Sequence, residues 1–304
     1  MKPDRKQGVV PLQLLARRHV AALCFLALSG NAIQISLAQQ SSKDAPSAPL
    51  PRSWAVDVVN NEMEILNHKG SYLRYRMRVV NARGDIVRDV IESKDGTVAR
   101  TILRDGKPLT DEQDKLERDR LNGLLQSPAD FLKRARNDDS DKKIADSLMH
   151  LMPDAMIYTP TPGQPQTGRN PGMTEAVFDY EPNPKFDPPT TKAEALRGLK
   201  GRVWVERKGR HLVRMEGNIF RDVNFGWGLL AHIYPGGQLA LDQVDVGNGR
   251  WTFSHFSERL TVRLLLVKTL NINTTIDASD FQHMPAMSYQ DAIKMLLATP
   301  LPTH

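Results

Sequence analysis

Histidines are the first candidates for chemistry, because a neutral imidazole binds zinc and titrates near neutral pH. No two histidines after residue 38 lie three to five residues apart, and no HExxH motif is present. His232 and His255 fall in predicted strands and could meet across a sheet, although two half-exposed polar residues are the simpler interpretation. We therefore expect no metal site and no cofactor.

Nucleophile and phosphate motifs are also missing from the sequence. There is no Gly-x-Ser-x-Gly elbow, and Ser254 next to His255 is adjacency in sequence only. The glycines at 226–228 and 247–249 separate predicted strands, whereas a dinucleotide fingerprint joins a strand to a helix. Paired acids such as Asp242 and Asp245 are commoner as solvated surface. We expect no catalytic residue, with a hydrolase assembled only in three dimensions as an alternative.

The first 38 residues have the three parts of a secretory signal peptide. A basic stretch is followed by the apolar run 20–28 and by small residues at Ser36 and Ala38. The apolar run is shorter than the about 20 residues that span a bilayer. The alternative is an uncleaved anchor. We expect a cleaved signal, a periplasmic or secreted protein, and a disordered leader at 39–52 that is rich in Gln, Ser, Ala and Pro.

Removing the signal changes both the charge and the thiol content of the chain. Residues 1–38 hold five of the 41 Lys and Arg and one of the 35 Asp and Glu, so the net charge falls from +6 to +2. That charge is not typical of a nucleic-acid binder. The only cysteine, Cys24, lies within the signal behind Leu23, which does not fit a lipobox. The remainder would be a cysteine-free protein that is not lipidated and has no transmembrane segment.

Residues 53–300 are expected to form one domain. A helix is predicted at 54–66, and strands at 72–79, 85–93 and 97–104 are linked by the turn Asp95-Gly96. The first strand alternates strictly and places Arg74, Arg76 and Arg78 on one side. These arginines could dock a partner or anionic lipid, but acids in the next strand, Asp85, Asp89 and Glu92, are the expected cross-strand partners.

A helical and proline-rich insert is predicted at 110–173. Thr110 and Gln113 form a capping box, and Pro128 restarts a helix at its first position. Separate helices are expected at 129–136 and 140–151, with the charged stretch 137–143 between them. The prolines and glycines of 159–173 predict a loop.

The C-terminal half predicts an antiparallel meander. Turn residues recur every 8–12 positions, which is typical of consecutive short strands. The expected strands are 177–180, 201–208, 210–219, 220–225, 229–234, 238–246, 251–258 and one or two within 259–276, with a final helix at 288–298. The fold class is therefore α+β, a curved antiparallel sheet forming an incomplete barrel with covering helices.

The stretch 264–267 is apolar at every position, which predicts a strand packed on both faces. Such a sheet can enclose a cavity for an acyl chain, although a filled core is the alternative. The residues expected to line the interior are Trp204, Trp227, Trp251, Phe253, Leu264 and Leu266.

Residues 175 to 282 resemble a family of exported bacterial proteins of unknown role. The resemblance is carried by the stretches 178–184, 199–205, 212–217, 225–230, 236–238 and 251–253, by the run Arg263-Leu-Leu-Leu-Val and by Asp280-Phe281. In strand order this region is similar to the outer-membrane lipoprotein carriers of the LolA/LolB type. That resemblance implies an incomplete barrel, covered by helices, that shelters acyl chains. The insert at 110–173 departs from the compact carriers.

Together these features favour a non-enzymatic envelope protein that binds a lipid or a lipoprotein acyl chain. A structural module that docks an envelope protein is the second hypothesis, and a hydrolase without a visible motif is the third.

Overall fold

The computed structural model describes residues 52–67, 70–161, 166–167, 174–225, 231–264 and 267–303. The predicted signal peptide and the leader up to residue 51 lie outside this part of the chain. The predicted loop at 159–173 is described only at 159–161 and 166–167.

The N-terminal part is a helix followed by a meander, as the alternation predicts. The elements are α2 (Arg52–Asn67), β1 (Tyr72–Asn81), β2 (Gly84–Ser93), β3 (Gly96–Arg104) and β4 (Lys107–Pro108). In β1 the side chains of Leu73, Tyr75, Met77 and Val79 are buried, while Arg76 and Arg78 are exposed. The turn between β2 and β3 uses Gly96 at φ 135°, a backbone angle that favours glycine.

The helical section contains α3 (Asp111–Gln126), α4 (Pro128–Met149) and α5 (Met152–Ala155). The capping box is confirmed, because the Gln113 N–H donates to the Thr110 hydroxyl and the Thr110 N–H donates to the Gln113 side chain. The predicted break at 137–143 is wrong, since α4 is continuous through it. A run of charged residues leaves a helix less buried, but it does not remove backbone hydrogen bonds from the helix as an interior Pro would.

The C-terminal part adds the remaining strands, a short 3-10 helix and a final helix. These elements are β5 (Met156–Pro160), β6 (Gln166–Thr167), β7 (Thr174–Pro182), η1 (Thr191–Gly198), β8 (Leu199–Glu206), β9 (Leu212–Ile219), β10 (Val223–Phe225), β11 (Ala231–Ile233), β12 (Gln238–Asp245), β13 (Trp251–Leu264), β14 (Lys268–Met284) and α6 (Tyr289–Ala298). The expected strand through 264–267 is wrong at its end, because Val267 lies in the turn before β14 and is 87% exposed.

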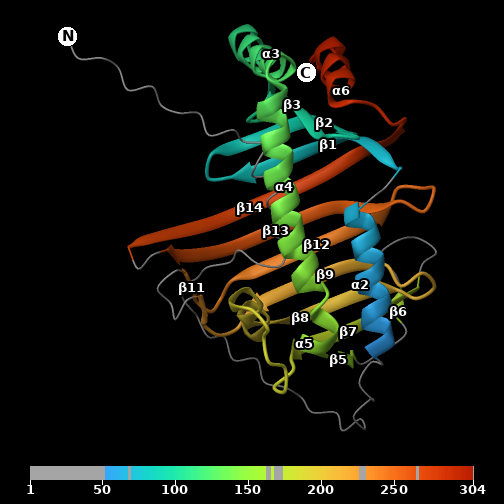
Figure 1. Cartoon of the computed structure of the whole chain (residues 1–304), viewed down its shortest axis with the longest axis vertical. Coiled ribbons are helices and arrows are strands. Elements are labelled where there is room, and N and C mark those ends of the chain that lie inside the picture. The colour runs from blue at the N-terminus through green and yellow to red at the C-terminus, as the bar shows by residue number, and fades with distance from the viewer. Residues whose placement is uncertain are drawn as a thin grey trace.

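The described strands form one antiparallel sheet of 14 strands. Eleven of them follow the order β4-β3-β2-β1-β14-β13-β12-β9-β8-β7-β5, while β6 pairs with β7, β11 pairs with β13, and β10 pairs with β11. The fold class is confirmed as α+β, and the sheet does not close, since β4 and β5 lie at its opposite ends (Figure 1). The order departs from a simple meander at β14, the last strand in sequence, which lies between β1 and β13.

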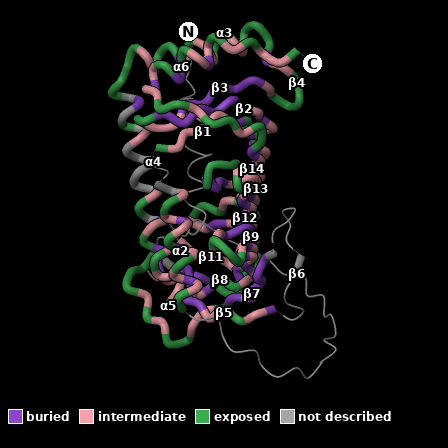
Figure 2. Tube along the Cα trace, turned by 90° about the vertical axis from the view of Figure 1, so that its right-hand side faces the viewer, coloured by how far each residue is buried: buried purple, intermediate pink, exposed green. Residues whose placement is uncertain are grey.

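The two faces of the sheet carry different cores. We call the face with Tyr75, Val203 and Leu260 the inner face. It holds the two larger hydrophobic clusters, and α2 and α4 lie on this side of the sheet (Figure 2). On the other, outer face, α3 and α6 pack against Ile91 and Val98. Among the described residues, no helix combines the length and the apolar character that a membrane span requires.

Gly123 offers a test of the α3 assignment. It lies exposed within the helix, and an added Cβ would meet no atom within 4 Å. We expect Gly123→Ala to raise the free energy of unfolding by about 0.5–1 kcal/mol, because alanine loses less backbone entropy in a helix. Gly106→Ala is the control, since its site is equally open but has φ +74° and should be destabilised. Urea unfolding measures both, and equal shifts would contradict the assignment.

Candidate binding site on the inner face

Helix α2 is fixed to the inner face by polar and aromatic contacts. The Asn61 amide donates to the carbonyls of Gly209 and Arg210 at 2.7 and 3.0 Å. The Arg210 guanidinium lies over the Trp54 ring at 3.2 Å from its centroid. Trp54 in turn meets Phe178 edge-on at 5.8 Å between the ring centroids. This helix therefore closes the inner face over β7, β8 and β9.

Helix α4 crosses the inner face but is held at its ends. Phe131 near its start belongs to the outer-face cluster and stacks on Tyr289 of α6 with the ring centroids 4.0 Å apart, while Ala145 and Leu148 near its end are buried. The sequence between them, residues 133–143, contains one apolar residue, Ala135. The main backbone contacts of α4 are with α3 and α2 (Figure 2). The backbone of α4 therefore passes over the inner face, and its middle is polar in sequence (Figure 1).

Three of the predicted ligand-binding residues lie on the inner face. Trp251 is buried and stacks on His211 with the ring centroids 4.7 Å apart. Phe253 is half-buried, meets Tyr75 edge-on at 6.2 Å and contacts both inner clusters. Leu264 is half-buried against the larger cluster.

The other three residues are not part of this group. Trp204 is half-buried on the outer face, where Arg214 lies 5.7 Å from its ring centroid, because it alternates with the inward residues Val203 and Val205. Trp227 and Leu266 lie outside the described residues.

Parts of the inner face keep apolar side chains that are only half-buried. Each is packed against the larger cluster yet only half-buried, although helices lie on this side of the sheet. They are Leu239, Phe253, Leu264, Leu270 and Ile272, from β12, β13 and β14. Leu264, Leu270 and Ile272 lie toward the β13–β14 hairpin, whereas Phe253 lies near the start of β13. We call the five half-buried residues together the apolar strip.

A buried polar cluster that the sequence did not predict lies under α2. Glu62 is 8% exposed and accepts hydrogen bonds from the Gln243 side chain and from the Leu212 N–H. Among the residues that the structure describes, neither its Oε1 nor the Gln243 Oε1 has a hydrogen-bond partner. Nearby, Arg250 donates to the Ile65 carbonyl and pairs with buried Glu92. Burial also lowers the pKa of His211.

Burial raises the pKa of Glu62 to about 7, and the two hydrogen bonds oppose that shift only in part. The folded state therefore favours the protonated form of the Glu62 carboxyl. The contribution of Glu62 to stability should be fully present below about pH 4.5, be lost as pH rises toward 7, and change no further above it, by roughly 3 kcal/mol in all. Urea unfolding across this range checks the slope. Glu62→Gln should remove it, and an unchanged slope in that variant would contradict the assignment.

The arginines of β1 are paired on the outer face, as the cross-strand interpretation expects. Arg78 pairs with Asp85 at 2.6 Å, Arg74 with Asp89, and Arg76 with Asp280 at 3.5 Å. Glu92 instead turns inward to Arg250. Farther along the same face, Asp277 and the ring of His255 are 2.7 Å apart.

The other residues considered for chemistry are not brought together. His255 pairs with Asp277, whereas His232 lies 3.0 Å from Asp222, so the two histidines do not meet. The Ser254 hydroxyl points to the Asp242 carbonyl. Within the described part of the chain, no three His, Cys, Asp or Glu residues could hold a metal ion.

A separate open cavity of about 540 Å³ lies beside α5, lined by residues of α2, β5 and the segment 183–187. Its walls include the ion pair between Arg52 and Asp154, and none of the predicted ligand-binding residues.

Comparison with known proteins gives little further information. No family model and no curated protein matches the chain. Among solved structures, it is similar to the crystal structure of a DUF1329 family protein from Desulfovibrio piger, with 11% identity over 80% of this chain and 98% of that one. The TM-score is 0.29, so this likeness carries no argument about function.

Proposed function

We propose that this protein is a non-enzymatic, exported binding protein that holds an acyl chain of a lipid or lipoprotein on the inner face. The observation that carries the proposal is the half-buried apolar strip Leu239, Phe253, Leu264, Leu270 and Ile272. A sheet face that served only as core would bury such residues fully, as it does at Leu260 and Val262.

The ligand class follows from the shape and chemistry of the strip. Its five residues come from three adjacent strands and none of them is charged, which suits a long apolar chain. The predicted export signal and the resemblance to lipoprotein carriers support an envelope role.

The second hypothesis, docking through the arginines of β1, gains no support from the contacts. Each of the three side chains is already paired with an acid.

Acyl binding is tested with a fluorescent fatty acid and by native mass spectrometry of protein purified from the cell envelope. The double variant Leu270→Gln, Ile272→Gln should bind at least about tenfold more weakly, because two apolar contacts are lost. The matched control is Asn271→Gln, Asn273→Gln, which changes exposed residues of the same strand that alternate with the strip. Equal affinity of the two variants, or no bound lipid in repeated preparations, would overturn the proposal.

A further inference from the structure

One corner of the sheet combines basic and apolar side chains at the surface. It lies where β8 begins, β9 ends and the β13–β14 hairpin turns. There β13 continues past its last pairing with β12, at Arg259, as far as Leu264, and the hairpin projects beyond the neighbouring strands (Figure 1). We call Lys200, Phe220, Arg221, Arg263, Val267 and Lys268 the basic corner.

The cations of this corner differ from the arginines of β1. Among the described residues, none of Lys200, Arg221, Arg263 and Lys268 forms a salt bridge with an acid. The nearby acid Asp222 is engaged by His232 at 3.0 Å. On β1, by contrast, every arginine is neutralised by a neighbouring carboxylate. The corner therefore presents uncompensated positive charge.

Apolar and aromatic groups lie among these cations. Phe220 is 38% exposed, with the Lys200 ammonium 5.1 Å and the Arg221 guanidinium 5.5 Å from its ring centroid. Arg263 lies 5.5 Å from the Tyr234 ring centroid. Val267 at the hairpin turn is 87% exposed. Exposed apolar side chains flanked by cations suit the boundary between lipid headgroups and acyl chains.

We propose that the basic corner docks on an anionic phospholipid surface. Lys200, Arg221, Arg263 and Lys268 would contact the phosphate groups, while Phe220 and Val267 would enter the headgroup region. A nucleic acid would satisfy the cations but leave Val267 in water. The proposal goes beyond acyl binding, since the corner's residues are not those of the apolar strip.

The test is co-sedimentation with vesicles of phosphatidylcholine alone or mixed with phosphatidylglycerol. Wild-type chain should bind the anionic vesicles and lose binding as salt is raised. The variant Arg221→Ser, Arg263→Ser, Lys268→Ser should bind about a hundredfold more weakly, from three lost charges near the surface. The variant Phe220→Ser, Val267→Ser should also bind more weakly. Every variant keeps the same N-terminus, so the predicted signal contributes equally.

The matched control is Lys94→Ser, Lys107→Ser, Lys115→Ser, which removes the same charge from exposed residues near the β2–β3 and α3 end of the sheet. It should bind like wild type. Equal binding to neutral and anionic vesicles, or equal losses in the two triple variants, would overturn the proposal. Acyl binding is measured without vesicles, so failure of one proposal is distinguishable from failure of the other.

Discussion

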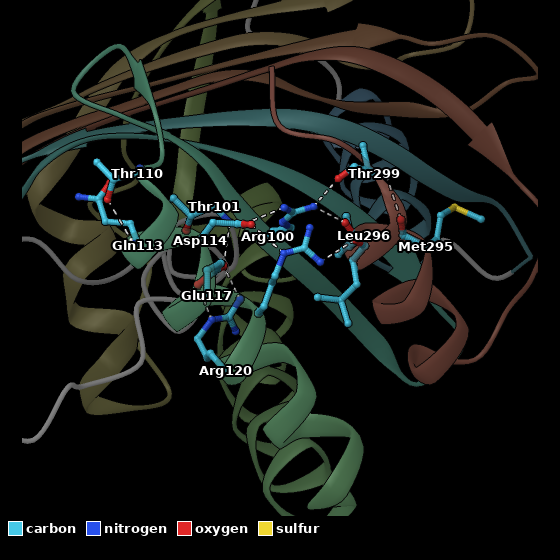
Figure 3. A network of polar contacts seen from close by, with 12 residues as sticks. Arg100, Thr101, Thr110, Gln113, Asp114, Glu117, Arg120, Met295, Leu296 and Thr299 are labelled. Carbon is cyan, nitrogen blue, oxygen red and sulfur yellow. Dashed lines mark hydrogen bonds and ion pairs between the residues drawn. The ribbon is translucent and has the colours of Figure 1, made fainter. Parts of the chain in front are cut away.

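Replacing Arg100 with Met is expected to lower the free energy of unfolding by about 3–5 kcal/mol. The substitution removes the cation that two backbone carbonyls and a carboxylate use as their hydrogen-bond donor. Arg100 is 1% exposed on the outer face of β3. Its guanidinium donates to the carbonyls of Leu296 and Thr299 at 2.6 and 2.5 Å and to Asp114 at 2.8 Å (Figure 3). It thereby joins α3 and the end of α6 to the sheet.

The position of this arginine explains the size of the effect. The last carbonyls of a helix have no partner within the helix, and a cation there also interacts favourably with the helix dipole. Here one buried side chain serves the end of α6 and a carboxylate of α3 together (Figure 3). Met has similar bulk but no donor, so Leu296, Thr299 and Asp114 would lose a hydrogen bond each.

The matched control for Arg100→Met is Arg78→Met. Arg78 also pairs with a carboxylate, but its side chain is 54% exposed, and such surface pairs contribute about 0–1 kcal/mol. Urea unfolding compares the two. If Arg100→Met lost no more stability than Arg78→Met, the joining role of Arg100 would be wrong.

The second large effect is expected for Gly201→Ala. A Cβ at this position would lie 1.9 Å from the Glu216 carbonyl oxygen and 2.9 Å from the Tyr180 hydroxyl. Gly201 faces Gly217 across β8 and β9, and the Tyr180 hydroxyl donates to the Glu216 carbonyl at 3.0 Å. Two facing glycines thus give the tyrosine room between the strands.

Because the first collision is with backbone, rotamer changes cannot relieve it, and β8 and β9 would have to separate. We expect a loss above about 3 kcal/mol, the upper end for overpacking, seen as a melting temperature about 10 °C lower. Tyr180→Phe should lose about 1 kcal/mol, since it removes one hydrogen bond. Adding Tyr180→Phe to Gly201→Ala should restore little. Full restoration would show that the hydroxyl, rather than the backbone, is the obstacle.

Local patterns predicted the local elements well. The alternation of Leu73, Tyr75, Met77 and Val79 predicted β1, and Thr110 with Gln113 predicted the start of α3. The alternation of side chains along β8 also indicates that Trp204 faces away from Val203 and Val205. This alternation corrects the expectation that Trp204 lines the interior.

Long-range pairing could not be predicted in the same way. Glu62 and Gln243 are 181 residues apart, and neither has a local sign of burial. Nothing in the sequence of residues 268–284 indicates that they pair with β1, because register across the sheet is set by packing rather than by neighbours in sequence.

The place of β14 has a consequence for the order in which the chain can fold. β1 and β13 present open edges until residue 284 has emerged, since β14 pairs with both. Unpaired edges invite association with other chains, and contacts so distant in sequence form slowly. During synthesis the chain would hold two incomplete sheets that its last strand joins. A chaperone that delays folding would then protect the chain from association through these edges. A chain shortened before β14 would keep two sheets that no strand joins.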